Sequence, residues 1–409
     1  MRAYTKFYIT PKGERAARSG HPWVYAEEIT NIEGEYRNGD LVDVVTGKGK
    51  YLGTGFVNDH SKIRVRLIST NTNDKFDADF WERRLRYAID YRRTVMPGAD
   101  FKCCRLIFGE ADHFPGLTVD RFNDILVAQT LSLGIEVRKE LIFNLLYKIL
   151  REQGEEIRGL YERNDVKIRL LEGMEENKGW FAFAEAAEPG EPLTEIVENG
   201  IRYNVDVENG QKTGFFLDQK YNRQAIAKIA KGKHVLDCFT HTGSFALNAG
   251  IAGSGHVLGV DASELAVEQA RENARLNGLE DRVHFQCADV FDLLPQLEQK
   301  GERFDVVILD PPAFTKSRSS IKNAVKGYRE INLRGMKLVK DGGYLATCSC
   351  SHFMDPELFT KTIREAAGNV HKRLRQVEYR TQAADHPILW AADGSYYLKF
   401  YIFQVCDGK

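Results

Sequence analysis

Two kinds of reactive side chain, carboxylates and thiols, recur at the ends of apolar segments in the C-terminal half of the sequence. Asp237 lies within the run Val235–Cys238, and Asp261 closes the run Val257–Val260. Between them the chain passes through a tight turn at Gly243. A carboxylate about 20 residues beyond the first strand can hold both hydroxyls of a ribose. The spacing therefore indicates a nucleoside-containing cofactor.

Two common cofactors, S-adenosylmethionine (SAM) and NAD, present such a ribose. NAD also needs its pyrophosphate placed at a helix N-terminus by a Gly-x-Gly-x-x-Gly turn. The turn here reads Phe-Thr-His-Thr-Gly-Ser, with the single glycine Gly243 where that fingerprint has three. Asp237 would repel a pyrophosphate, whereas it suits the positively charged amino group of SAM. The residues therefore favour a methyltransferase over a nicotinamide dehydrogenase.

Two further carboxylates follow later apolar segments. Asp289 comes after Val283–Gln286, where it could contact the adenine amine or cap a helix. Asp310 ends Val306–Leu309 and precedes two prolines, which remove two backbone donors and make the turn rigid. Methyltransferases that act on bases use such a turn to present the target base. The order and spacing of the four carboxylates predict methyl transfer to a base.

Two thiols, Cys348 and Cys350, end the next apolar segment. Carbon 5 of cytosine is a poor nucleophile, and a thiolate that adds at carbon 6 turns the ring into a reactive enamine. One of these cysteines could supply that thiolate, while Asp310 could stabilise the adduct near ring N3. Buried structural thiols are the alternative. A Cys-x-Cys metal site lacks a second ligand pair, so we expect no metal.

The residues around the two prolines bear on the target atom and on the substrate. Methylation of an exocyclic amine usually places an aromatic residue directly after the prolines, but here that position is Ala313, with Phe314 one further. This favours carbon methylation. Residues 315–340 contain eight basic residues and one acid. Such a segment beside the catalytic turn could grip phosphates, or it could be a solvated helix face.

Strands that alternate with helices from about Gly214 predict a doubly wound parallel sheet, which would gather these side chains at one edge. The expected strands are His234–Cys238, Val257–Val260, Val283–Gln286, Val306–Leu309 and Tyr344–Cys348. The expected helices begin at Ser244, span Ser263–Asn277 and lie near Tyr328–Val339.

The N-terminal half has a different pattern. The first 72 residues predict a small β unit with a short helix at Gly13–Ser19 and strands at Leu41–Val45 and Ile63–Leu67. An arginine-rich helix is expected over Asp77–Val95, as either a solvated or an RNA-contacting face. Residues 105–200 predict an α+β segment. The expected domains are 1–72, 73–195 with a linking helix at 77–96, and 196–409.

Composition excludes some classes of protein. The chain has 409 residues and a net charge of −1, but residues 101–200 hold 12 basic against 19 acidic residues, which argues against a nucleic-acid surface there. No apolar run approaches the ~20 residues of a membrane helix, and no secretory signal stands at the N-terminus. Seven cysteines without a Cys-x-x-Cys pair fit a reducing, cytoplasmic compartment.

Specific motifs along nearly the whole chain resemble those of the RlmI-type ribosomal RNA cytosine-C5 methyltransferases. Gly20-His21-Pro22-Trp23-Val24-Tyr25 is similar to the PUA domain of that family, an RNA-binding β-barrel. Phe108-Gly109-Glu110-Ala111-Asp112 is similar to the central domain. Lys212–Gln219, Leu309–Phe314 and Thr347–Ser351 resemble the signatures of the SAM-binding domain. The fold class that the resemblance implies is multidomain α/β, with a PUA barrel, a central α+β domain and a Rossmann-like methyltransferase domain.

The resemblance also implies roles for individual residues, with SAM as cofactor and 23S ribosomal RNA as substrate. The expected catalytic residues are Cys350, favoured over Cys348 as nucleophile, and Asp310. The expected cofactor-binding residues are Asp237, Phe239, Thr240, Gly243, Asp261, Ala262, Asp289, Val290, Asp310, Phe216 and Gln219. The expected substrate-binding residues are Pro311, Pro312, Phe314, Lys316, Arg318, Arg64 and Arg66.

The resemblance leaves several points open. Relatives with two catalytic cysteines carry one directly after the prolines, where this chain has Ala313, so another base must remove the carbon 5 proton. Guanine methylation without a covalent adduct and a catalytically silent RNA-binding protein are the alternatives. Members of the family are often dimeric, and a homodimer is one expectation, although the sequence identifies no interface.

Overall fold

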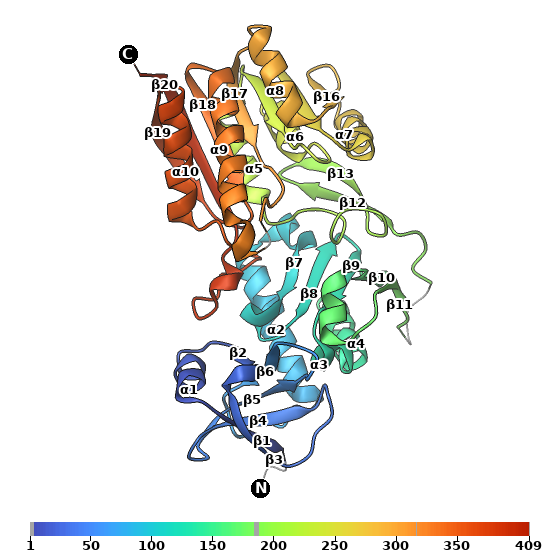
Figure 1. Ribbon diagram of the computed structural model, residues 1–409. Coiled ribbons are helices and arrows are strands. Elements are labelled where there is room, and N and C mark those ends of the chain that lie inside the picture. Colours follow the sequence, from blue (N-terminus) through green and yellow to red (C-terminus); the bar gives the residue numbers. More distant parts are fainter. Residues whose placement is uncertain (1–3, 184–187, 316, 409) are drawn as a thin grey trace. The chain divides into compact units, whose positions relative to one another are not determined.

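The computed structural model describes residues 4–183, 188–315 and 317–408, and Figure 1 shows the arrangement of its elements. The chain forms two compact units. The first contains Met1–Ile196, Val205–Leu217 and Ala384–Ser395, and the second contains Val197–Asn204, Asp218–Ala383 and Tyr396–Lys409. The boundary runs through the antiparallel pair β12 (Leu193–Glu198) and β13 (Ile201–Asp206).

A six-stranded sheet with the order β2-β6-β5-β4-β1-β3 opens the first unit. Its strands are β1 (Thr5–Ile9), β2 (Trp23–Tyr25), β3 (Ile29–Glu33), β4 (Leu41–Thr46), β5 (Tyr51–Val57) and β6 (Ile63–Ser69). Phe7, Val44 and Val65 are fully buried in its core, and the helix α1 (Pro11–Arg18) follows β1. The strands predicted at 41–45 and 63–67 and the short helix are thus confirmed.

A second sheet of the same unit has the order β11-β10-β9-β8-β7. Its strands are β7 (Cys103–Phe108), β8 (Leu117–Phe122), β9 (Ile125–Thr130), β10 (Gly159–Asn164) and β11 (Asn177–Phe181). The helices of this part are α2 (Ala78–Val95), α3 (Leu133–Glu136) and α4 (Lys139–Glu152). Asp77 caps α2 by accepting the backbone N–H of Phe80 at 3.2 Å, so the predicted arginine-rich helix begins where expected.

The second unit is built on a seven-stranded sheet with the order β16-β15-β14-β17-β18-β20-β19. Its strands are β14 (His234–Cys238), β15 (His256–Asp261), β16 (Val283–Cys287), β17 (Phe304–Leu309), β18 (Val339–Ser349), β19 (Lys372–Arg380) and β20 (Lys399–Asp407). The first five run parallel, and β20 is antiparallel to both β18 and β19. The doubly wound sheet that the sequence predicts is therefore confirmed.

Helices cover both faces of this sheet (Figure 1). Helices α8 (Val290–Gln299), α9 (Ile321–Leu338) and α10 (Pro356–Asn369) pack with the sheet in one large hydrophobic core. On the other face lie α5 (Lys220–Ala230), α6 (Ser244–Ile251) and α7 (Glu264–Leu276). No helix in the described part of the chain is both long and apolar enough to span a membrane.

The strand order reverses between β14 and β17, which makes this the topological switch point of the sheet. Ligands of doubly wound proteins bind beyond the carboxyl ends of the strands at such a point. Here β14, β15, β17 and β18 end at or beside Asp237, Asp261, Asp310 and Cys350, respectively. The fold thus brings the reactive side chains to one edge.

Candidate active site

The turn from β14 into α6 has an unusual backbone. Phe239 and His241 adopt φ values of 63° and 50°, a region that non-glycine residues rarely enter, and Gly243 lies at 86°. A Cβ atom on Gly243 would come within 2.8 Å of the Phe285 ring. Glycine is therefore required here both because of its backbone conformation and because a side chain would not fit. Such conformations concentrate at ligand-binding sites.

Asp237 is fully buried beneath this turn. Its Oδ2 accepts hydrogen bonds from the Thr240 hydroxyl at 2.5 Å and from the Ala246 backbone N–H at 2.9 Å. Its Oδ1 has no hydrogen-bond partner among the described residues. Burial, which outweighs these hydrogen bonds, raises the pKa of Asp237 to about 7, and the nearby Asp310 and Asp261 carboxylates add to the rise. A buried carboxylate with one unpaired oxygen fits the ammonium group of an amino-acid ligand.

Asp261 ties the turn to the end of β15. Its Oδ2 accepts the backbone N–H of His241 at 2.9 Å, and its Oδ1 accepts that of Ser263 at 3.0 Å. Because a carboxylate oxygen can accept more than one hydrogen bond, both oxygens can still bind ribose hydroxyls. These two backbone bonds fix the orientation of the carboxylate.

The other residues expected around the adenosine differ in their exposure. Asp289 is exposed and caps α8 by accepting the backbone N–H of Phe291 at 2.8 Å, so the helix-cap interpretation holds for its geometry. Ala262 is exposed, whereas Val290 is buried in the core of the sheet. Phe216 belongs to the first unit, where Lys212 lies 4.8 Å above its ring.

Asp310 is positioned by a chain of polar side chains. The Gln219 amide donates to both Asp310 oxygens at 3.1 Å, and Asn222 donates to the Gln219 carbonyl oxygen at 2.6 Å. Arg380 in turn donates to Asn222 at 3.2 Å. Burial and the neighbouring Asp218 carboxylate raise the pKa of Asp310 to about 6. At pH 7 about a tenth of such a group carries its proton.

The two thiols at the end of β18 have different surroundings. Cys348 is fully buried within hydrogen-bonding reach of Asp310 and Gln219. Burial and the Asp310 charge raise the pKa of Cys348 well above its usual range, so this thiol ionises poorly. Cys350, in contrast, follows the last residue of the strand and is partly exposed. A substrate could reach the second thiol more easily than the first.

Two residues that the sequence did not single out hold the segment that carries Cys350. The Tyr328 hydroxyl, from α9, accepts a hydrogen bond from Ser349 at 3.0 Å and lies 3.2 Å from the Ser351 hydroxyl. Lys399, the first residue of β20, donates to the backbone oxygen of Ser351 at 2.7 Å. The signal that could have revealed Lys399 is a lysine at the start of the apolar run Phe400–Phe403.

The residues expected to contact substrate near the catalytic turn differ in their exposure and packing. Pro311 is buried and Pro312 is exposed. The Phe314 ring lies 4.6 Å from Tyr328 and 6.1 Å from Phe291, so it packs partly against the helices. Lys316 lies outside the described residues, and Arg318 begins a 3-10 helix, Arg318–Ser320.

Arg64 and Arg66, expected to contact RNA, are both in ion pairs within the first unit. Arg64 pairs with Asp59, while Arg66 contacts Glu110 at 3.2 Å and Glu172 at 2.8 Å. The Arg66 side chain is only 12% exposed. A phosphate would have to compete with two carboxylates for its guanidinium group.

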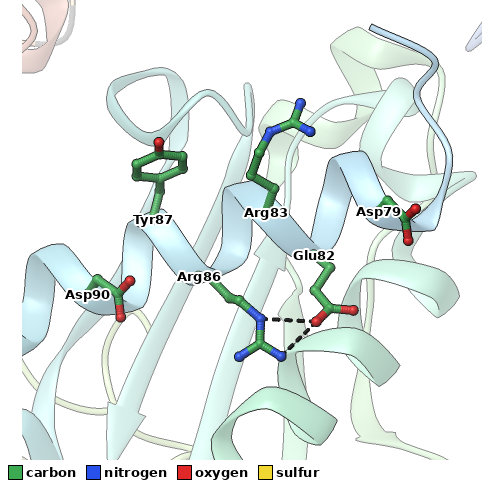
Figure 2. A pocket seen from close by; sticks show the side chains of 6 residues that line it. All are labelled: Asp79, Glu82, Arg83, Arg86, Tyr87 and Asp90. Atoms are coloured by element: carbon green, nitrogen blue, oxygen red, sulfur yellow. Dashed lines mark hydrogen bonds and ion pairs between the residues drawn. The ribbon is translucent and has the colours of Figure 1, made fainter.

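The exposed face of α2 carries a shallow hollow lined by charged side chains (Figure 2). Three of its six lining residues are acidic, namely Asp79, Glu82 and Asp90, and the other three are Arg83, Arg86 and Tyr87. Figure 2 shows Arg86 bonded to Glu82, and Arg86 also pairs with Glu152 of α4 at 2.7 Å. These carboxylates disfavour a phosphate there, so the geometry favours the solvated-face interpretation of this part of the helix.

Metal ligands were not expected in the sequence. In residues 4–183, 188–315 and 317–408, no group of three or more His, Cys, Asp or Glu side chains is arranged to hold a metal ion.

Comparison with known proteins agrees with the geometry of the second unit. Residues 182–400 match the family model for S-adenosylmethionine-dependent methyltransferases, and residues 7–70 match that of PUA-like domains. These matches confirm the predicted PUA-like domain, the methyltransferase fold and SAM as the cofactor. Asp237 and Asp261 have the chemistry to hold the amino and ribose groups of that cofactor.

Curated relatives match almost the full length of the chain. Proteins named ribosomal RNA large subunit methyltransferase I are 39% identical in Aeromonas salmonicida, over 96% of this chain and 97% of the relative, and 40% identical in Shewanella denitrificans, over 97% and 98%.

Solved structures share the fold. A protein described as a methyltransferase and crystallised with SAH has a TM-score of 0.82 at 20% identity, covering 98% of this chain and 99% of that one. A protein from Streptococcus mutans, described as a SAM-dependent methyltransferase, has a TM-score of 0.81 at 21% identity with the same coverage. The chain thus belongs to the SAM-dependent methyltransferase family that includes the ribosomal RNA large subunit methyltransferases I.

Proposed function

We propose that this protein methylates carbon 5 of a cytosine in large-subunit ribosomal RNA through a covalent adduct with Cys350. The substrate class rests on the names of its full-length relatives. The observation that carries the chemistry is the arrangement of β17 and β18. Asp310, with its raised pKa, directly follows the first of these neighbouring strands, and the partly exposed thiol of Cys350 directly follows the second.

The proposed roles of the side chains follow from their chemistry. The unpaired oxygen of Asp237 would accept a hydrogen bond from the ammonium group of the cofactor, and Asp261 would accept hydrogen bonds from its ribose hydroxyls. When bound, SAM supplies an electrophilic methyl group on a sulfonium sulfur. The Cys350 thiolate forms a bond to carbon 6 of the ring, and the protonated Asp310 donates its proton at ring N3. These two steps make carbon 5 nucleophilic.

Release of the product reverses the addition. After carbon 5 has taken the methyl group, a base removes its proton and the electron pair reforms the carbon 5–carbon 6 double bond. The bond from Cys350 sulfur to carbon 6 breaks, and ring N3 returns its proton to Asp310. The chain has Ala313 after the prolines, so this base is not a cysteine at that position.

RNA in which cytidine is replaced by 5-fluorocytidine provides a direct test. Carbon 5 then carries fluorine, which a base cannot remove, so the adduct is expected to accumulate in the presence of SAM. Peptide mapping by mass spectrometry should place the linked nucleotide on Cys350. Linkage to Cys348 would contradict the assignment of the nucleophile, and turnover without any adduct would favour guanine or another non-covalent target.

The basic helix α9 offers a contact for the RNA backbone. Lys337 and Lys340, at and just beyond its C-terminal end, pair with Glu298 at 2.8 Å and Asp305 at 3.0 Å, respectively. Lys322 and Lys326, in its first two turns, are exposed and have no ion pair within the described part of the chain. We therefore expect the first turns of α9 to hold phosphates.

The double variant Lys322→Ala/Lys326→Ala is expected to bind ribosomal RNA fragments more weakly. Each lost phosphate contact lowers the slope of log affinity against log salt by about 0.7–0.9, so the slope should fall by about 1.5. Fluorescence anisotropy at several salt concentrations measures this slope. The matched control is Lys337→Ala/Lys340→Ala, which removes the same charge from paired positions, and an equal loss in both double variants would contradict the assignment.

A further inference from the structure

Lys399 is a buried lysine in the wall of the candidate active site. Its side chain is 1% exposed, and in the β18–β20 pair it lies opposite Ser349, one residue before Cys350. Its ammonium group donates to the backbone oxygens of Ser351 and Tyr397, both at 2.7 Å. The lysine therefore anchors the chain directly after Cys350.

A lysine in this position is costly for the fold. Within the described residues no carboxylate lies at ion-pair distance from Lys399, and burial lowers the pKa of its ammonium group to about 8. Two negative charges partly offset this lowering of the Lys399 pKa. The Cys350 thiolate has the larger effect and the Asp355 carboxylate the smaller. The ammonium group, which bonds to the residue directly after Cys350, therefore lies where the ionised thiol of Cys350 could balance its charge.

Two titratable groups besides Lys399 lie in the electrostatic neighbourhood of Cys350. Tyr328 and Cys348 interact electrostatically with Cys350, and both become neutral or anionic rather than positive on titration. Asp355, which caps α10, adds negative charge near Lys399. Lys399 brings a positive charge to this cluster, and that charge favours a thiolate.

We propose that Lys399 is a positioning residue that holds the Cys350 segment and stabilises the Cys350 thiolate through its ammonium charge. The inference rests on the proposed function, in which Cys350 is the nucleophile. The ammonium keeps its proton throughout. The thiol gives its proton to water, the thiolate charge is lost when sulfur bonds to carbon 6, and the charge returns when that bond breaks.

The test is the pH dependence of alkylation of Cys350 by iodoacetamide, followed by peptide mapping in the absence of RNA and SAM. An ordinary thiol ionises near pH 8.5, and an adjacent cation lowers that midpoint by about one unit or more. We expect the wild-type midpoint below that of N-acetylcysteine. Lys399→Met should raise it by about one unit, which is about tenfold less thiolate at neutral pH. Lys399→Arg, which keeps the charge, should restore most of the effect.

Several controls keep the result interpretable. The exposed Cys287 reports on general reactivity, and its alkylation profile should not change between the variants. A wild-type midpoint for Cys350 at or above that of N-acetylcysteine would overturn the proposal without any variant, even if Lys399→Met failed to fold. An unchanged midpoint in a folded Lys399→Met protein would overturn it as well.

The experiment separates this inference from the proposed function because alkylation requires no turnover. If the midpoint shifts as expected but Cys350→Ala still forms 5-methylcytidine, the thiolate pairing stands and the proposed nucleophile is wrong. If Cys350→Ala is inactive while Lys399→Met leaves the midpoint unchanged, the proposed function stands and the role of Lys399 is wrong.

Discussion

Cys350→Ala is expected to lose methyl transfer by about a thousandfold or more while keeping its affinity for SAM within about twofold. Removal of a covalent nucleophile eliminates the step that makes carbon 5 reactive. The cofactor groups contact Asp237 and Asp261 in our account, so the loss of the Cys350 sulfur should leave their binding intact. Transfer of labelled methyl groups to RNA measures the first effect, and calorimetric titration with SAM measures the second.

The matched control for this prediction is Cys348→Ser. Cys348 is buried beside Asp310 and Gln219, and a serine hydroxyl keeps the size and the hydrogen bonding of that position. We expect this variant to retain activity within about tenfold, since one weakened hydrogen bond costs about 1 kcal/mol. An inactive Cys348→Ser together with an active Cys350→Ala would reverse the assignment of the nucleophile.

Asp237→Asn is expected to weaken SAM binding by about 30-fold to 150-fold and at the same time to stabilise the free protein at alkaline pH. The two internal hydrogen bonds both go to Oδ2, which the asparagine carbonyl can replace. The variant therefore changes mainly the unpaired oxygen into an NH₂ group, which cannot accept a hydrogen bond from an ammonium ion. Loss of one charge-assisted hydrogen bond in a buried site costs about 2–3 kcal/mol.

The stability effect follows from the raised pKa of Asp237. Burial raises it from 3.8 to about 7, so the folded state holds a proton that the unfolded chain has released. The resulting stability is fully present below the unfolded value and is lost as the pH rises through about 7. The side-chain amide of the Asp237→Asn variant does not titrate in this range. The free energy of unfolding of the variant, relative to wild type, should therefore rise between pH 6 and pH 8, by on the order of 1 kcal/mol.

Urea denaturation at both pH values, without cofactor, measures this difference. Asp281→Asn, which makes the same chemical change at an exposed position, serves as the control and should alter neither the stability nor the SAM affinity. If Asp237→Asn binds SAM as tightly as wild type does, the assignment of this carboxylate to the cofactor is wrong.

Much of the second unit could be predicted because its strands are short apolar runs that end in distinctive residues. The strand His234–Cys238 and the start of α6 at Ser244 agree with the structure at every predicted residue. The helix expected over Ser263–Asn277 is α7, and those two residues are its N-cap and C-cap. In contrast, β19 (Lys372–Arg380) lies at the edge of the sheet and is largely polar. Because none of its residues is fully buried, this edge strand gives only a weak hydrophobic period to detect.

In the candidate site, too, some residues could be predicted from the sequence and others could not. Carboxylates at strand ends can be recognised from the chain because the order of strands determines where they gather. The partners that orient them come from distant segments, as Gln219, Asn222 and Arg380 do for Asp310. The place of Lys399 depends on the antiparallel pairing of β18 with β20, which fixes Ser349 opposite this lysine. Such cross-strand neighbours are set by tertiary structure, and the linear spacing of residues does not contain them.

The most direct test of the central claim is the identity of the methylated nucleoside. The purified protein is incubated with labelled SAM and undermethylated large-subunit ribosomal RNA, and the RNA is then digested and analysed by mass spectrometry. The account predicts 5-methylcytidine, formed by the wild type and absent with Cys350→Ala. A methylated guanosine, formed equally well by that variant, would contradict the account and leave Cys350 without a role in the chemistry.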